Sequence, residues 1–174
     1  MQYGLEFLLQ MLTEILKIAR RNSMKVSSKG EYALRALILL GNHPGKVIGI
    51  QEIAEKTLVS IHYLEQLLLQ LKKLGYVTSK RGAKGGYILQ MNAETINIGE
   101  VIRQLEGPLS PMGCASITKY EPCALEEGCQ LKPLWTLVRD TIAYVLERTT
   151  LEDLLQNRVT KLEGDDSVAI KRDA

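Results

Sequence analysis

The chain has 174 residues, of which 45% are hydrophobic and 24% charged, the balance of an ordinary globular protein with one domain or one small domain plus an appended element. It carries only three cysteines, an odd number, and no cleavable signal precedes them. This cysteine usage excludes a fold held together by disulfides. It favours a reducing, cytoplasmic compartment in which thiols serve as ligands or redox groups.

Residues 1–23 form a predicted amphipathic helix that stands apart from the rest of the chain. Apolar residues recur at helical spacing, but Glu6, Glu14 and Lys17 interrupt them, which rules out a membrane span. The segment also lacks the basic start and small-residue cleavage site of a signal peptide. Because the sequence from Met24 reads as complete by itself, we interpret the segment as an upstream-start extension or a loosely docked helix.

The net charge of +2 is the sum of a basic and an acidic part of the chain. Residues 24–92 carry ten Lys or Arg against four Glu and no Asp, a net +6, whereas residues 93–174 carry nine against fourteen, a net −5. A basic half suits a polyanion. Charge runs are more often solvated surface, so charge alone supports nucleic acid only weakly.

Helical patterns occupy three segments of the basic half, at residues 28–41, 50–57 and 60–75. Ser28 and Glu31 stand in the S-x-x-E relation of a capping box, an apolar run follows them, and Gly41 ends the first helix. The second helix is the short stretch IQEIAEKT. A tight turn, LVS, separates it from the third.

The third helix is expected to begin with Ser60 as its cap and to bury one leucine stripe, made of Leu64, Leu67, Leu68 and Leu71. His62, Tyr63 and Gln66 are left facing outward. Two short helices and a tight turn of this kind predict a helix-turn-helix, whose second helix can lie in the DNA major groove. The motif alone is a moderate signal, since helical hairpins also occur in folds that never touch DNA.

The stretch YVTSKRGAKGGYIL, residues 76–89, strengthens the DNA-binding interpretation. It reads as two short strands around a glycine-rich hairpin tip that bears Lys80, Arg81 and Lys84. Glycines allow the tip to approach a phosphate backbone closely, and the cations contact phosphates or enter the minor groove. The sequence therefore predicts a winged helix-turn-helix.

These residues resemble the winged helix-turn-helix regulators that include the iron-sulfur cluster regulator IscR, the nitric-oxide-sensing repressor NsrR and the cysteine-metabolism repressor CymR. The resemblance runs from Met24 to about Leu155. Its most specific parts are KGEYALRAL, SIHYLEQLLLQLKKLGYV, RGAKGGY and a cysteine cluster followed by LW. It implies a cytoplasmic homodimer that binds a palindromic operator and that, like many members, carries a [2Fe–2S] or [4Fe–4S] cluster.

The resemblance also implies roles for single residues. Ser60, Tyr63 and Gln66 match recognition-helix positions that contact DNA, and Arg81 matches the wing arginine. The chemistry agrees, because Gln can bond bidentately to adenine and Arg to guanine, or Arg can enter a narrow minor groove. Glu65 matches a family position near the bases, although a solvated helix-face Glu is equally expected. His62 replaces a small residue of better known members.

The three cysteines follow the pattern C-x8-C-x5-C and form the candidate metal site: Cys114, Cys123 and Cys129. Thiolates suit iron-sulfur clusters and zinc alike. Structural zinc sites usually show paired C-x2-C knuckles, which are absent here, and unliganded thiols are the remaining alternative. The resemblance to the family's cluster loop favours an iron-sulfur cluster, with [2Fe–2S] slightly preferred over [4Fe–4S].

A fourth ligand is missing from the cysteine pattern. In some family members a histidine three residues after the last cysteine completes the site, but Lys132 stands there in this chain. In others an acidic residue of the first helix, supplied by the partner subunit, takes the place, and Glu31 is the matching position. The predicted capping box is its alternative role. Glu121, Glu126 and Glu127 remain local possibilities.

The acidic half supplies the predicted sensing and dimerisation elements. Helices are expected at residues 96–107 and 131–149, with the cysteine loop at 107–128, a short terminal turn at 151–155 and a mostly disordered tail at 156–174. The long helix carries an apolar stripe made of Leu131, Trp135, Val138, Ile142 and Val145. It suits either domain core or a symmetry mate that spaces two recognition helices about one DNA turn apart.

The predicted fold class is therefore mainly α with a small β-hairpin wing, as a winged helix-turn-helix domain plus a long dimerisation helix. Its predicted divisions are the extension (1–23), the DNA-binding domain (24–92), the cluster loop with dimerisation helices (93–155) and the tail (156–174). The predicted function is a homodimeric regulator that senses iron, redox state or nitric oxide. A cluster-free regulator controlled by thiol oxidation or a partner protein is the alternative. An enzyme with a cysteine nucleophile is a third hypothesis with little support, because no histidine lies near the thiols in the sequence.

Overall fold

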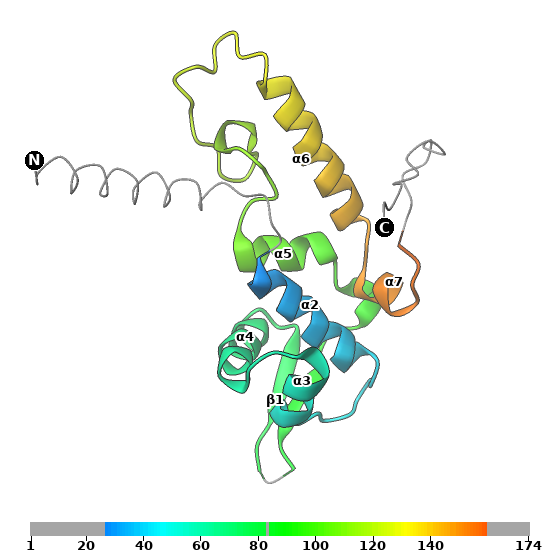
Figure 1. The fold of residues 1–174 in the computed structure, drawn as a ribbon. Helices are drawn as coiled ribbons and strands as arrows, with labels where there is room; N and C mark the ends of the chain where they lie inside the picture. The colour runs from blue at the N-terminus through cyan, green and yellow to red at the C-terminus, as the bar shows by residue number, and fades with distance from the viewer. Residues whose placement is uncertain (1–26, 83, 160–174) are drawn as a thin grey trace, which may run out of the picture.

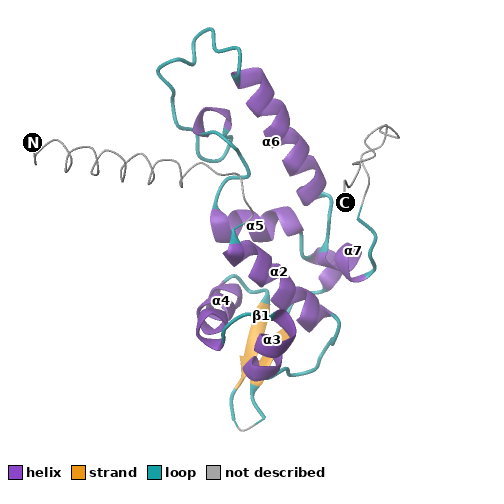
Figure 2. Cartoon of the chain, viewed as in Figure 1, coloured by secondary structure: helices purple, strands orange, loops and turns teal. Residues whose placement is uncertain are grey.

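The computed structural model describes residues 27–82 and 84–159, so the predicted N-terminal helix lies outside the described residues, as does most of the predicted tail. The described chain is helical except for one β-hairpin (Figures 1 and 2). Its elements are, in order, α2 (Ser28–Gly41), α3 (Ile50–Thr57), α4 (Ile61–Lys73), β1 (Val77–Lys80), β2 (Gly86–Leu89), η1 (Ala93–Thr95), α5 (Ile98–Glu106), η2 (Gly113–Ala115), α6 (Lys132–Glu147) and α7 (Leu151–Leu155). The predicted fold class is confirmed. None of the described helices is long and apolar enough to cross a membrane.

One apolar core joins the two halves of the described chain. Helix α2 lies at its centre and buries Leu37 and Leu40, while α4 buries the predicted leucine stripe against it. The same core continues into α5 through Val101 and Ile102, and α7 adds Leu151, which is fully buried. Burying each such side chain contributes roughly 1.5–3 kcal/mol to folding. The DNA-binding segment therefore packs as one body with α5 and α7.

The N-terminus of α2 is capped differently from the prediction. Ser27 is the N-cap, with extended backbone angles, and its Oγ accepts a hydrogen bond from the Lys29 amide at 3.2 Å. The carboxylate of Glu106 accepts from both the amide and the hydroxyl of Ser27. Glu31 instead forms an ion pair with Arg35. The capping box predicted for Ser28 and Glu31 is wrong, because the helix starts one residue earlier than the S-x-x-E pattern requires and α5 supplies the capping carboxylate.

The N-terminus of α2 and the C-terminus of α5 each bind a charged side chain from the other helix. Glu106, the last residue of α5, caps α2, while Nζ of Lys29 donates to the carbonyl oxygen of Leu105 at 2.7 Å. Negative charge at a helix N-terminus and positive charge at a C-terminus are both favourable. Gly30 permits the approach, since a Cβ there would lie 2.0 Å from Oε1 of Glu106. These contacts between α2 and α5 fix the point at which the cysteine loop leaves α5.

The helix-turn-helix turn has an unusual residue at its centre. Helix α3 ends at Thr57, and Leu58 takes the left-handed conformation with φ of 57°, a conformation that leucine rarely adopts. Ser60 then occupies the N-cap position of α4, as predicted. Its side chain makes no capping hydrogen bond, however, so that part of the prediction is wrong. The Ser60 hydroxyl is left on the surface.

The wing is a two-stranded antiparallel hairpin in which Val77 pairs with Leu89 and Lys80 with Gly86. A backbone bridge between Ile48 and Tyr87, with hydrogen bonds of 3.0 and 2.9 Å, anchors β2 to the segment before α3. Gly86 is required at this crossing, because a Cβ there would lie 2.2 Å from the carbonyl oxygen of Ile48. The wing is thereby held beside the helix-turn-helix.

Helix α6 extends away from the core, whereas α7 returns to it (Figure 1). None of the sixteen residues of α6 is buried within the described chain. After α6 the chain turns back, and a bridge between Asn97 and Thr150 brings Leu151 into the core beside α2. The cysteine loop and the wing lie at opposite ends of the molecule in Figure 1. The described protomer therefore keeps its cysteines far from its own wing.

Candidate DNA-binding surface and cysteine loop

The outer face of α4 presents polar side chains beyond the turn. Ser60, His62, Glu65 and Gln66 are all exposed. Tyr63 is only half-buried, because its ring packs edge-on against Tyr32 of α2 with ring centres 5.7 Å apart. The outward orientation predicted for Tyr63 is therefore correct only in part. Its ring is packed against the core while the helix face around it is open.

Cations gather on the wing next to the end of α4. Lys80, Arg81 and Lys84 are exposed around the hairpin tip. Nζ of Lys72 in the last turn of α4 donates to Oγ of Ser79 on β1 at 2.6 Å, which brings the end of α4 alongside the strand. Lys72 was not predicted from the sequence to contact DNA, although its position in the basic last turn of a predicted recognition helix could have indicated that role. The helix and the wing thus form one basic surface.

Arg35 is a second residue that sequence reasoning did not select. Its Nη1 donates to the carbonyl oxygen of Thr57 at 3.0 Å, and its Nη2 pairs with Glu31 one helical turn earlier. The guanidinium carbon also lies 5.6 Å from the ring centre of Tyr32. The side chains of Glu31 and Arg35 remain 52% and 43% exposed. Glu31 therefore lies on an open helix face and is held only by a surface ion pair.

The cysteine loop connects α5 to α6 and is built from consecutive turns. Cys114 lies in the short helix η2 and is half-buried, Cys123 is exposed and Cys129 is half-buried. The Glu126 amide donates to the Cys123 carbonyl, and the Cys129 amide donates to the Glu126 carbonyl. Within the described residues, no three His, Cys, Asp or Glu side chains converge on a point where they could hold a metal ion. The structure thus brings the cysteines onto one loop without gathering their thiols.

Glu126 is committed to neighbours inside this loop. Its carboxylate accepts hydrogen bonds from the Tyr120 hydroxyl and from Nζ of Lys132, the first residue of α6. The hydrogen bond from Lys132 is the main cause that lowers the pKa of Glu126, and the hydrogen bonds to Glu126 raise the pKa of both Tyr120 and Lys132. Glu121 is exposed and lies 3.5 Å from Nζ of Lys119, and Glu127 is also exposed. Of the three local carboxylates, Glu126 is the least available as a ligand.

Comparison with known proteins places this geometry in a family. The family model Rrf2, described as "Iron-dependent Transcriptional regulator", matches residues 26–157, which include the helix-turn-helix, the wing, the cysteine loop and α6. The chain belongs to the Rrf2 family. Members of this family are transcription regulators and not enzymes, and the same holds for this Rrf2 protein.

Individual relatives agree with the family match. The Rrf2 protein is 42% identical over 132 residues to the HTH-type transcriptional regulator CymR of Bacillus subtilis, a match that covers 75% of this chain and 89% of the relative. It is 38% identical to the HTH-type transcriptional regulator NsrR of the same organism, over 78% of this chain and 92% of the relative.

Solved structures are similar to this chain along most of their length. The structure of CymR, the global cysteine regulator of B. subtilis, is 40% identical and superposes with a TM-score of 0.65 over 76% of this chain and 97% of that one. The oxidized form of Staphylococcus aureus CymR is 38% identical, with a TM-score of 0.61 over 76% and 96%. The described fold is therefore that of solved Rrf2 regulators.

Proposed function

We propose that this Rrf2 protein is a homodimeric, cytoplasmic repressor that binds a palindromic operator and responds to a signal at its three-cysteine loop. The observation that carries the proposal is the single core, which joins an exposed recognition helix and basic wing to the helix that starts the cysteine loop. Such a rigid connection allows a change in the loop to reach the DNA-binding surface.

Dimerisation is assigned to α6. Leu131, Leu134 and Leu137 remain 57%, 49% and 64% exposed, and Trp135 and Ile142 are only half-buried. An apolar helix face of this size is costly to leave in water and suits a second copy of the same helix. Pairing of two such helices would set the distance between two recognition helices.

Operator recognition is assigned to the surface of α4 and the wing. We propose that Gln66 and Arg81 read base edges, that Ser60 and Tyr63 reach phosphates, and that Lys80 and Lys84 neutralise phosphates. Exposure of these side chains, with the ring of Tyr63 held by Tyr32, supports these roles. Phosphate contacts position a protein on DNA, whereas base contacts specify the sequence, so the two groups have different tests.

An iron-sulfur cluster is the occupant proposed for the loop, with [2Fe–2S] preferred over [4Fe–4S]. Thiolate chemistry and the family's iron-dependent description support it. The described conformation does not, because the three thiols do not converge. Binding of a cluster therefore requires the turns between Cys114 and Cys129 to rearrange. We propose Glu31 of the partner subunit as fourth ligand, because it stands at the family position of an acidic ligand, it does not serve as a helix cap, and its ion pair with Arg35 is exposed.

Reversible thiol oxidation without a cluster is the second candidate. The similarity to a protein whose oxidized form has been solved supports it. Half-buried and exposed cysteines on a loop of turns can pair after a modest backbone movement. In this reading the same loop, the same dimer and the same DNA surface are used, and only the chemistry at the thiols differs.

Anaerobic purification of the full-length protein separates the two candidates. A cluster predicts visible absorbance together with iron and acid-labile sulfide in stoichiometric amounts, all lost in Cys123→Ser. Thiol oxidation predicts a colourless, iron-free protein whose operator affinity changes with a mild oxidant and recovers with a reductant. A colourless protein whose operator affinity is indifferent to oxidant would refute both assignments of the loop, while operator binding itself is tested independently by footprinting.

A further inference from the structure

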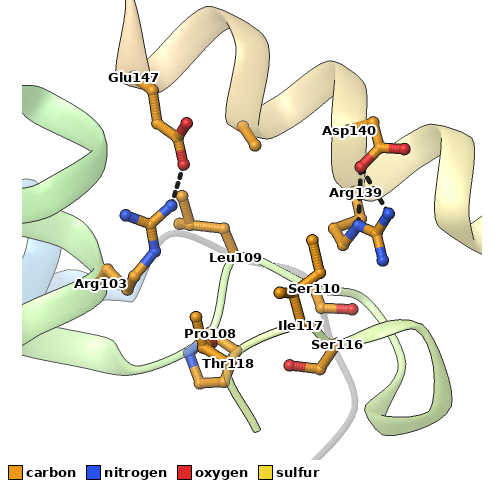
Figure 3. Close-up of a pocket in the computed structure, with 11 residues that line it drawn as sticks. Arg103, Pro108, Leu109, Ser110, Ser116, Ile117, Thr118, Arg139, Asp140 and Glu147 are labelled. Carbon is orange, nitrogen blue, oxygen red and sulfur yellow. Dashed lines mark hydrogen bonds and ion pairs between the residues drawn. The ribbon is translucent and has the colours of Figure 1, made fainter. Parts of the chain in front are cut away.

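A pocket of about 190 Å³ lies between α5, α6 and the part of the loop that flanks Cys114 (Figure 3). A site for one water needs only about 10–15 Å³ of such space, so the pocket has room for a small organic molecule. The apolar part of its lining is formed by Pro108, Leu109, Ile117 and Ala143. Hydroxyl groups of Ser110, Ser116 and Thr118 line the loop side. None of these residues has a role in the proposed DNA contacts.

Two ion pairs lie at the ends of the pocket (Figure 3). Arg103 of α5 pairs with Glu147 through one nitrogen, Nη2, and Arg139 pairs with Asp140 on α6. Two guanidinium groups and two carboxylates leave the lining with no net charge. A singly charged ion therefore gains no net attraction from the lining as a whole, and selectivity depends on which polar atoms of the two ion pairs can still bind a ligand.

The two ends differ in what they can still bind. Among the described residues, Nε and Nη1 of Arg103 have no hydrogen-bond partner, and neither has Oδ2 of Asp140. Arg139 is more heavily engaged, because each of its three nitrogens already has a partner: Nε and Nη2 contact Asp140, and Nη1 donates to the carbonyl oxygen of Ala115, next to Cys114. Arg103 can thus accept a carboxylate, and Asp140 can accept an ammonium group, without loss of either ion pair.

The pocket lies on a different side of α6 from the apolar stripe. At about 100° per residue, the lining residues 139, 140, 143 and 147 centre roughly 130° around the helix from the stripe at residues 131, 135, 138, 142 and 145, and roughly 165° from the exposed leucines at residues 131, 134 and 137. A partner helix that covers the stripe therefore leaves the pocket mouth open. The ligand site and the proposed dimer contact do not compete.

We propose that this pocket binds a small zwitterionic α-amino acid. Its carboxylate pairs with Arg103, its ammonium group with Asp140, and its short side chain packs on Leu109 and Ala143. Because Ser116 and Ala115 border the site, occupancy holds the loop segment that carries Cys114 in place. Binding itself does not rest on the proposed function; only its consequence for the thiols does.

Isothermal titration calorimetry on the full-length protein tests the site. The probes are L-alanine, L-serine and L-valine, with N-acetyl-L-alanine and L-alaninamide as analogues that lack one charge each. We expect saturable binding of at least one free amino acid, one per protomer, and binding weaker by about tenfold or more for both blocked analogues, since each loses a charge-assisted hydrogen bond. No saturable heat with any free amino acid, or equal binding of an analogue, would overturn the proposal.

Variants place the binding in the pocket. Ala143→Leu adds bulk to the apolar part of the lining without a change of charge, and Arg103→Gln removes the carboxylate partner; each should weaken binding by about tenfold or more. Arg148→Gln makes the same change on α6 outside the pocket and should leave binding unaltered. Binding that survives both pocket variants, with melting temperatures near that of the parent, refutes the site. If Arg103→Gln unfolds, Ala143→Leu and the two analogues still decide.

Discussion

Nη1 of Arg35 donates a hydrogen bond to the carbonyl oxygen of Thr57 at 3.0 Å, and this contact ties α2 to the last residue of α3. The same side chain lies against Tyr32, whose ring packs on Tyr63 of α4. One exposed residue of α2 therefore touches the turn of the helix-turn-helix directly and the recognition helix through one intermediate ring. Its other partner is Glu31, the proposed ligand.

Arg35→Met is expected to loosen this turn. It keeps the aliphatic stem but removes the hydrogen bond, so the free energy of unfolding should fall by about 1 kcal/mol, and operator affinity should fall with it. Urea denaturation and anisotropy titration measure the two effects. Arg148→Met is the matched control, because that arginine lies on α6 over Tyr144. Operator affinity that stays at the parent value would show that the turn does not need Arg35.

If Gln66 and Arg81 contact base edges, truncating either side chain to alanine should reduce the preference for operator DNA over unrelated DNA. Gln66→Ala and Arg81→Ala should each weaken binding to the operator by about 1–3 kcal/mol while leaving binding to unrelated DNA much less affected. Footprinting gives the protected sequence, and anisotropy with operator and scrambled DNA gives the difference. The assignment is wrong if both variants lose affinity equally for the two DNAs.

Lys84→Ala provides the contrast for that experiment. A phosphate contact carries no sequence information, so the variant should bind operator and scrambled DNA more weakly by the same factor. The slope of log affinity against log salt should become shallower by about 1. An unchanged salt slope would remove Lys84 from the interface.

Glu31 is expected to matter for the cluster and little for folding. Its only described interaction is a surface ion pair with Arg35, so Glu31→Gln and Glu31→Ala should each cost roughly 0–1 kcal/mol of stability. If Glu31 is the fourth ligand, both variants should change the visible spectrum, cluster retention or redox potential of a folded dimer. Identical spectra and potentials in both would return the search to Glu121 or Glu127.

Gly86→Ala should displace the wing. The added Cβ would lie 2.2 Å from a backbone oxygen of Ile48, which cannot swing away as a side chain can. We expect a loss of about 1–3 kcal/mol in unfolding free energy and a marked loss of DNA affinity. Gly49→Ala is the control, because its nearest neighbour is 3.8 Å away, and it should cost less than about 1 kcal/mol. Equal stability of the two variants would contradict the close crossing.

The Tyr120–Glu126–Lys132 contact has a defined pH behaviour. The lowered pKa of Glu126 means that its contribution to loop stability is present above its unfolded pKa near 4.5 and is lost as pH falls through the lower folded value. The raised pKa of Tyr120 acts in the opposite direction, since its contribution is present below pH 10 and is lost as pH rises through the folded value. Glu126→Gln should therefore lower the tyrosinate pKa towards 10 in an ultraviolet titration of Tyr120, followed by difference from Tyr120→Phe. A pKa of Tyr120 that is the same in both backgrounds would show that the hydrogen bond is absent in solution.

The sequence by itself determined the elements of the DNA-binding half and their order. The periodicity of hydrophobic residues, the turn residues and the glycines are local signals. The bounds of α3 and the pairing across the wing therefore follow from residues that are close in the chain. The same holds for the leucine stripe of α4, which is buried as expected. The family resemblance also rests on these local patterns, and the family match agrees with it.

Only the tertiary structure decided which groups meet across long separations. Glu106 accepts hydrogen bonds from the N-cap residue Ser27, 79 residues earlier in the chain, and so takes the capping role predicted for Glu31. The hydrogen bond from Arg35 to Thr57, the commitment of Glu126 to Lys132 and the separation of the three thiols likewise depend on where folded segments pack or turn. A local sequence pattern indicates which interactions a residue can make. Which partner it contacts depends on the groups that the folded core brings within hydrogen-bonding distance, and that partner determines the residue's role.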